Sequence, residues 1–232
     1  MFSKSVDDFL RLLKKSPSGA VFNPWWEIDE QNDVGASAPA FCRKQLRAYL
    51  QERLGKARLA IIGEAIGYRG GHFSGIPMTS ERMLLGKRPD IVASIEPRRT
   101  SKPSICPDGF SEPTATIVWG ALLKFGVLPD EFVLWNAFPW HSFDPRRGML
   151  SNRMPNKSEQ AAGFPALKAF LELFSCEQVV ALGKIAAAQL EKLGVNVHSV
   201  RHPASGGAKL FRQQIARIVE RYLSTTSAAR SF

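Results

Sequence analysis

Cysteine is scarce in this chain, and long apolar runs are absent. Its three cysteines, Cys42, Cys106 and Cys176, are widely spaced and form no CxxC pair, so we expect structural thiols and no metal. No run reaches the roughly 18 apolar residues of a transmembrane helix. The N-terminus alternates apolar and charged residues where a signal peptide would be apolar. These absences predict a cytoplasmic protein with no membrane partner.

Acidic residues are also few compared with basic ones. The 232 residues include 21 Asp and Glu against 31 Lys and Arg, which gives a net charge of +10. Such an excess suits an anionic partner, either nucleic acid or a membrane surface, and charge alone does not distinguish the two. The chain length and an apolar fraction of 44% fit one large domain.

Four short apolar runs alternate with helical patterns. The runs are 59–62, 132–135, 179–182 and 195–200, and we read each as a buried strand. Helical spacing of apolar residues predicts the helices between and around them, at about 5–13, 46–54, 114–125, 165–175, 186–193 and 212–223. The alternation predicts an α/β fold of three layers, α/β/α, with a central four-stranded parallel sheet. We expect a single domain over 1–232, with an N-terminal helical extension over about 1–57 and a flexible tail over about 224–232.

Unusual polar or glycine-rich segments follow three of these strands. They are 63–81, with five glycines between Gly63 and Gly75, then 136–141 and 201–207. Pro139 cannot donate to a strand ladder, so we expect the chain to leave the sheet at about Asn136. Ligands of parallel sheets bind beyond the carboxyl ends of the strands. The three segments are therefore predicted to share one cleft.

The same three segments resemble the motifs of the uracil-DNA glycosylase superfamily. Gly63-Glu64-Ala65-Ile66-Gly67 resembles its first motif, Asn136 its uracil-reading asparagine, and His202-Pro203-Ala204-Ser205 its second motif. The resemblance covers about 58–215 and implies a monofunctional glycosylase that hydrolyses the N-glycosidic bond of flipped-out deoxyuridine, initiating base excision repair. It implies a monomer without cofactor or metal, whose partner is DNA containing uracil or abasic sites. A bacterial protein of this kind would associate with the nucleoid.

The resemblance assigns the two main site residues. The Asn136 amide has a donor and an acceptor, which match O4 and N3–H of uracil; the residue could instead make a turn after its strand. His202 is implied to donate a hydrogen bond to O2 as negative charge develops there, a contribution of about 100- to 1,000-fold in rate. It could instead cap a helix or bind a core carbonyl.

The sequence leaves several alternatives for the group that activates water. Ala65 stands where well-known members of the superfamily have an aspartate. Glu64 and Glu81 are the nearest acids, and each could be a general base or a structural residue. A positioned water and stabilisation of the departing anion could also suffice.

The base pocket departs from the family at one more position. Ala65, Ile66 and Gly67 are implied to surround the base, and Met78 replaces a stacking phenylalanine. Phe73, Phe138 or Trp140 could supply the missing ring. His72 is also assigned to the base pocket, and both His72 and His141 could hold water or phosphate or be structural. An alanine at the position of Ala65 also occurs in the iron–sulfur branch of the superfamily. The cysteines that hold the cluster in that branch are absent here, so no iron–sulfur cluster is expected. The loop from Gly63 to Met78 resembles in length the single-strand-selective and multi-substrate branches.

Residues at the expected cleft rim are predicted to hold DNA. The phosphate-binding candidates are Ser80, Lys184, Ser205, Gly206, Lys209 and Arg212. Leu210 could enter the vacated base stack or belong to the helix core. Because of Ala65 and Met78, a non-catalytic module that binds uracil or abasic sites is an alternative to the enzyme. A hydrolase of free nucleosides is a third, although it would not need the charge of +10.

Overall fold

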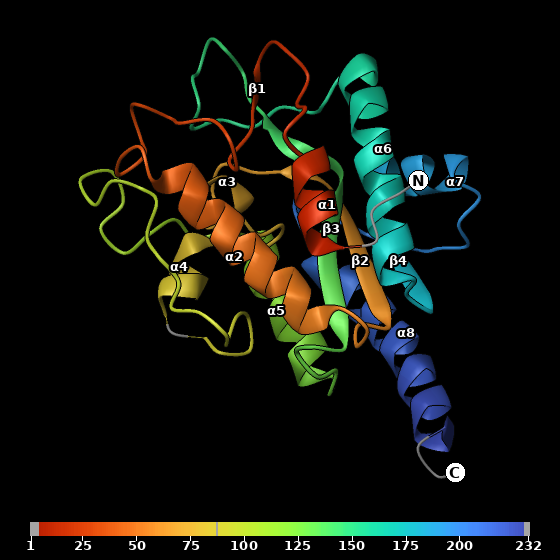
Figure 1. The fold of residues 1–232 in the computed structure, drawn as a ribbon. Coiled ribbons are helices and arrows are strands. Elements are labelled where there is room, and N and C mark those ends of the chain that lie inside the picture. The colour runs from red at the N-terminus through yellow and green to blue at the C-terminus, as the bar shows by residue number, and fades with distance from the viewer. Residues whose placement is uncertain (1–4, 87, 230–232) are drawn as a thin grey trace.

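The computed structural model of the chain describes residues 5–86 and 88–229 (Figure 1). Its sheet has the order β1-β3-β2-β4-β5. The strands are β1 Val21–Phe22, β2 Leu59–Ile66, β3 Phe132–Ser142, β4 Gln178–Leu182 and β5 His198–Val200. Four of them are parallel, and β1 runs antiparallel to β3. The parallel sheet confirms the predicted α/β class and adds one short edge strand that sequence patterns missed.

Helices cover both faces of the sheet. They are α1 Val6–Leu12, α2 Ala38–Arg53, α3 Gly71–Ser74, α4 Glu81–Leu85, α5 Pro113–Lys124, α6 Lys157–Phe174, α7 Lys184–Lys192 and α8 Ala208–Ala229. On one face, Trp135 of β3 contacts Phe9 of α1 and Phe170 of α6, at ring-centroid distances of 5.0 and 5.1 Å. Phe132 of β3 instead contacts Trp119 of α5, at 4.9 Å. Successive strand residues face opposite ways, so α5 covers the other face and the three layers are confirmed. None of the described helices is long and apolar enough to cross a membrane.

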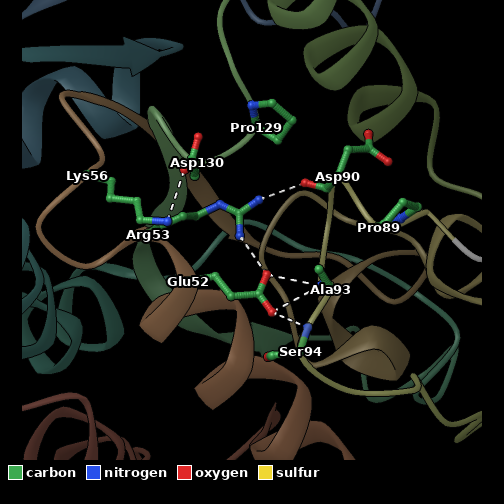
Figure 2. A pocket seen from close by; sticks show the side chains of 9 residues that line it. All are labelled: Glu52, Arg53, Lys56, Pro89, Asp90, Ala93, Ser94, Pro129 and Asp130. Atoms are coloured by element: carbon green, nitrogen blue, oxygen red, sulfur yellow. Dashed lines mark hydrogen bonds and ion pairs between the residues drawn. The ribbon is translucent and has the colours of Figure 1, made fainter.

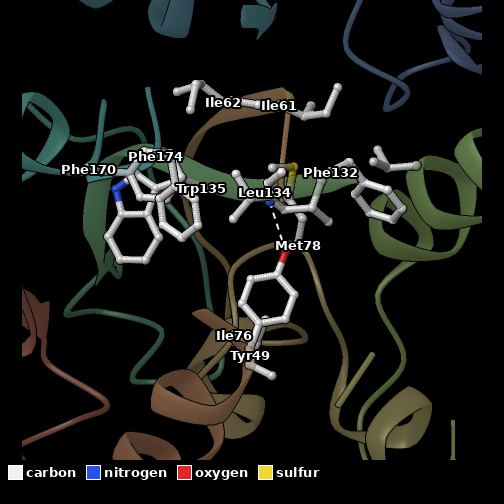
Figure 3. Close-up of a cluster of buried hydrophobic side chains, with 14 of the residues drawn as sticks. Tyr49, Ile61, Ile62, Ile76, Met78, Phe132, Leu134, Trp135, Phe170 and Phe174 are labelled. Carbon is white, nitrogen blue, oxygen red and sulfur yellow. Dashed lines mark hydrogen bonds between the residues drawn. The ribbon is translucent and has the colours of Figure 1, made fainter. Parts of the chain in front are cut away.

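Helix α2 lies along the outer edge of β3. Strand β1 pairs only with His141 and Ser142 of β3, which leaves the rest of that edge without a strand partner among the described residues. The Leu134 amide there donates a hydrogen bond of 2.8 Å to the Tyr49 hydroxyl of α2 (Figure 3). Tyr49 thus satisfies a strand group that would otherwise be open to another chain.

Strand β3 continues through Pro139, contrary to the expectation that the chain leaves the sheet at Asn136. The partners of Ala65 and Ile66 in β2 are Phe138 and His141 of β3. Pro139 and Trp140 are therefore extra residues in a bulge, where no ladder hydrogen bond is needed from proline. Because the strand continues, Asn136 is held within the sheet and not on a loop.

Helix α6 begins eight residues before the predicted start at Pro165. Its first turn is a capping box: Asn156 accepts from the Glu159 amide at 2.9 Å, and Glu159 accepts from the Asn156 amide at 2.8 Å. This box is a strong helix start, so Pro165 lies inside the helix. At the other end of the chain, α8 continues to Ala229 through most of the predicted tail 224–232. Residues 230–232 of that tail lie outside the described residues.

The N-terminal segment is held against the glycine-rich loop by a buried tryptophan. Ser5 caps α1 by accepting from the Asp8 amide at 3.1 Å. Trp25 is fully buried, and its indole N–H donates to the Gly75 carbonyl at 2.9 Å. Gly75 has φ of +71°, and a Cβ there would lie 2.6 Å from the Cys42 carbonyl oxygen. The segment therefore supports the glycine-rich loop that follows β2.

Candidate active site

A cavity of about 400 Å³ opens at the carboxyl end of the sheet. The three predicted segments converge there, because Gly63, Asn136 and His202 all line it. The other predicted residues in its lining are Glu64, Ala65, Ile66, Gly67 and Met78. This convergence confirms the predicted cleft, whereas the roles of the individual residues stay predictions.

The Asn136 side chain is buried and has no hydrogen-bond partner. The residue is 1% exposed, and neither its Oδ1 nor its Nδ2 has a partner within the described part of the chain. It pairs with Gly63 across the sheet, and a Cβ on Gly63 would lie 2.5 Å from Oδ1. Leaving a buried donor or acceptor unsatisfied costs about 1–3 kcal/mol. An amide that keeps both free at a cavity is suited to bind a ligand edge.

The hydrogen bonding of His202 determines which ring nitrogen can donate. Its Nδ1 accepts from the Ala204 amide at 3.1 Å, so the proton of the neutral ring is on Nε2. Burial, and then the positive charge of Arg201, lower the pKa of His202. The residue is therefore a neutral donor at neutral pH, in the wall of the same cavity as Asn136.

Met78 lines the cavity and has an unusual backbone conformation. Its φ is +47°, a left-handed conformation that strains a side chain other than glycine and often occurs at functional sites. The side chain is 6% exposed, and its Sδ would lie 3.2 Å from a Cβ on Gly63. Met78 and Asn136 are therefore neighbours across Gly63.

The predictions that Phe73, Phe138 or Trp140 supplies a ring face to the cavity are wrong. Phe73 stacks on Phe110 with centroids 4.7 Å apart, and Trp140 donates its indole N–H to the Leu13 carbonyl. Phe138 contacts Trp140 at 5.4 Å. All three predicted rings are buried in the core. Among the residues that the structure describes, no Phe, Tyr or Trp lines the cavity.

His72 and His141 also lie in the core, so the prediction of His72 at the base is wrong. Their Nδ1 atoms are 2.9 Å apart, and His141 Nε2 donates to the Ser151 carbonyl at 2.7 Å. His72 Nε2 lies 3.4 Å from Asp29 Oδ2. Burial lowers the pKa of His72, and burial and His72 together lower that of His141 to about 3. The pair joins α3 to β3 and, through Asp29, the N-terminal segment as well.

Glu81 is a structural residue, contrary to its predicted catalytic role. It is 1% exposed and does not line the cavity. Its carboxylate accepts from the amides of Thr100 and Ser101, at 2.7 and 2.9 Å, and from the Ser101 hydroxyl. These bonds attach the irregular segment after α4 to the start of that helix.

We expect Glu81→Ala to destabilise the fold by about 3 kcal/mol, because it leaves two buried amides without acceptors. Denaturant unfolding measures the change. The exposed Glu96 has no hydrogen bond or ion pair among the described residues, and Glu96→Ala should change stability by less than about 0.5 kcal/mol. Equal losses in the two variants would contradict the structural role of Glu81.

Among the described residues, two acids line the cavity, and sequence patterns predicted only Glu64. Glu64 is half-buried, has no partner among the described side chains, and has a pKa raised by burial. Strand alternation points it to the opposite face from Gly63 and Asn136. The second acid is Glu112, the residue before α5. It lies in a long irregular segment without a motif, so no sequence signal indicated it.

Sequence reasoning also missed the loop between β3 and α6, which brings Asn152, Arg153 and Met154 to the cavity. Asn152 accepts from the Tyr68 amide at 2.9 Å. Arg153 donates twice to Glu159, at 2.7 and 2.6 Å, and so is already paired. Met154 is 64% exposed. The available signal was the position of this loop directly after the strand that carries Asn136.

Most predicted rim residues lie on the surface. Lys184, Ser205, Gly206, Lys209 and Arg212 are exposed, and Leu210 is 47% exposed, which excludes a core role for Leu210. Ser205 and Gly206 both have positive φ, in the turn before α8. Ser80 is an exception: it has no exposed surface, so the prediction that it contacts phosphate is wrong.

A second cavity, of about 470 Å³, is lined in part by residues that come just before β2 and β3 in the chain, among them Lys56 and Asp130 (Figure 2). Arg53 is buried in its wall and donates to the carbonyls of Tyr49, Asp90 and Ile91 at 3.0 to 3.1 Å. Lys56 there pairs with Asp130 at 3.2 Å. The bonds of Arg53 attach the segment around Asp90 to α2, which is a structural function. No group of three or more His, Cys, Asp or Glu in the described parts of the chain could hold a metal.

The family model of the uracil DNA glycosylase superfamily matches residues 51–222. The chain is similar in fold to the crystal structure of wild-type SMUG2 from Pedobacter heparinus, with a TM-score of 0.61 and 16% sequence identity. The match covers 97% of this chain and 98% of that one. No curated protein matches the sequence.

Proposed function

This chain belongs to the uracil-DNA glycosylase superfamily, and we propose that it is a monofunctional enzyme that removes uracil from DNA. Family membership supports a DNA glycosylase, a hydrolase of glycosyl bonds. The main observation that supports uracil as the substrate is the Asn136 amide. It is buried, has no hydrogen-bond partner among the described residues, and lines the same cavity as His202. The protein would thereby initiate base excision repair.

Recognition begins when the nucleotide leaves the stack, because its glycosidic bond cannot be reached inside a duplex. Uracil N3–H then donates to the Asn136 Oδ1, and O4 accepts from Nδ2. Cytosine has an amino group at C4 and an acceptor at N3, so it mismatches an amide in this orientation. The backbone of Gly63 and the side chain of Met78 bound the pocket beside this amide.

Hydrolysis breaks the bond between N1 of uracil and C1′ of the sugar, and the electron pair leaves with the base. Water supplies the oxygen that bonds to C1′ and loses a proton, which Glu64 or a further water accepts and which finally neutralises the uracil anion. His202 donates its Nε2 proton as a hydrogen bond to O2, where negative charge develops. Ala65 has no group to take a proton from water, so the sugar cation and a positioned water supply the reactivity, with Glu64 as the remaining predicted base.

DNA binding is largely electrostatic in this proposal. The net charge of +10 attracts the phosphate backbone, and Lys184, Lys209 and Arg212, which are exposed, would contact phosphates. Leu210 is the candidate to fill the vacated stack. The non-catalytic binding module is the second candidate function, favoured by the absence of an acid at Ala65.

Alkali treatment of a labelled uracil-containing oligonucleotide separates these functions. A glycosylase leaves abasic sites that alkali converts to strand breaks. A gel shift without breaks would support the binding module. Release of base from free deoxyuridine, but not from DNA, would support a nucleoside hydrolase.

Gly63→Ala tests whether Asn136 needs its present position. The added Cβ would lie 2.5 Å from Asn136 Oδ1, so the amide must move, and we expect uracil release to fall at least about tenfold. Gly120→Ala is the matched control, because a Cβ there contacts nothing within 4 Å. Single-turnover rates on uracil-containing DNA measure both, and equal rates would show that the amide position is unimportant.

A further inference from the structure

The carboxyl group of Glu112 lies in the cavity wall without a partner. Its Oε2 is inaccessible to solvent and has no hydrogen bond within the described residues. A Cβ on Gly70 would lie 2.3 Å from Oε2, and one on Gly67 would lie 3.4 Å from Oε1. The carboxyl group thus occupies space that these two glycines leave open.

The charged groups around the cavity do not neutralise this acid. Arg153, from the loop before α6, is paired with Glu159. Arg69, from the loop after β2, is exposed and donates to the Tyr68 hydroxyl at 2.8 Å. Glu64 of β2 is a second acid, and His202 is a neutral ring whose pKa is lowered by burial and Arg201. An ionised Glu112 would therefore be an unpaired charge with one oxygen out of contact with water.

We propose that Glu112 acts in its protonated form, as a second hydrogen-bond donor to the departing base beside His202. The inference rests on the proposed glycosylase function and deepens it. The proton stays on the carboxyl group throughout, and only a hydrogen bond to a base oxygen or nitrogen strengthens as negative charge develops.

The negative charge that develops on the leaving base explains why the protonated form of Glu112 is needed. A carboxylate in the wall would repel the anionic leaving base, whereas a carboxylic acid can donate to it. Burial raises the pKa of Glu112 to about 7. Below pH 7 the acid holds its proton, and above pH 7 its protonated fraction falls about tenfold per pH unit. Uracil release should therefore decline as the pH rises through 7.

Single-turnover rates from pH 5 to 9 on uracil-containing DNA test the proposal. Wild-type protein should lose about tenfold per pH unit above pH 7. Glu112→Gln keeps a neutral N–H donor, so it should remain within a few-fold of wild type at pH 6 and show no decline to pH 9. Glu112→Ala should be about tenfold slower at pH 6, also without the decline. The distant Glu96→Gln should follow wild type, and Glu64→Gln should retain the decline.

Two outcomes would overturn the proposal. One is a decline above pH 7 that Glu112→Gln shares with wild type, and the other is a large loss in Glu112→Gln at every pH, which would mean that the carboxylate form is required. Infrared difference spectra between wild type and Glu112→Gln give a readout independent of activity. The C=O stretch of a protonated acid should be present at pH 6 and lost at pH 9. If no DNA substrate is cleaved, the proposed function fails. The spectra still show whether Glu112 holds its proton. An ionised Glu112 at pH 6 contradicts the proposal.

Discussion

Asn136→Asp should reduce uracil release on the order of 1,000-fold. The substitution keeps the size of the side chain but removes the N–H donor for O4 of uracil. It also places a negative charge, or a proton that must be held, in a buried position that has no cation partner among the described residues. A charge there opposes the anion that forms on the leaving base, so the loss exceeds that of a single hydrogen bond.

Single-turnover cleavage of uracil-containing DNA measures this loss, and circular dichroism checks that the fold is kept. Asn196→Asp is the matched control, because it makes the same change of charge at an exposed residue that does not line the cavity. It should cleave at the parental rate. If Asn136→Asp cleaves within tenfold of the parent, the amide does not read the base.

The positions of Asn136 and His202 could be predicted because they follow from a rule of topology. Apolar runs identify parallel strands, and the residues that follow such strands meet at one edge of the sheet. The rule needs only the approximate ends of the strands. The prediction of the cleft was therefore correct although β3 continues through a bulge at Pro139. It was also unaffected by the predicted start of α6, which was eight residues too late.

The ring candidates and Glu112 could not be predicted because they depend on packing. Phe73 and Phe138 are close to the site in sequence, but their rings are buried in the core. Glu112 reaches the cavity from the N-terminal end of α5 only because Gly67 and Gly70 leave room for its carboxyl group. That contact joins residues more than forty positions apart, and no local pattern in the chain indicates it.

The roles of the two acids near the first motif could not be predicted either, because they also depend on contacts in the folded chain. Sequence proximity suggested both Glu64 and Glu81, and their environments differ. Glu81 accepts hydrogen bonds from Thr100 and Ser101, is fully buried and does not line the cavity. Glu64 has no such partner among the described residues and borders the cavity. Hydrogen-bond partners, which sequence does not reveal, separate the structural acid from the remaining candidate.

His202→Ala should slow uracil release by about 100- to 1,000-fold while leaving DNA affinity within a few-fold of the parent. The Nε2–H of the neutral ring donates to O2 mainly in the transition state, so its loss affects the rate more than binding. The Ala204 amide also loses its acceptor, but it lies on an exposed turn where water can replace the ring. The fold should therefore tolerate the change.

The pH dependence distinguishes a donor from a structural histidine at this position. As the pH falls below the lowered pKa of His202, Nδ1 gains a proton and can no longer accept from the Ala204 amide. The wild-type rate should therefore fall on the acid side, and His202→Ala should lack that limb. His198→Ala is the matched control, since His198 bonds Gln178 at 2.9 Å and does not line the cavity. A His202→Ala variant that cleaves at the parental rate, or that loses DNA binding and rate together, contradicts the assignment of His202 as the donor to O2.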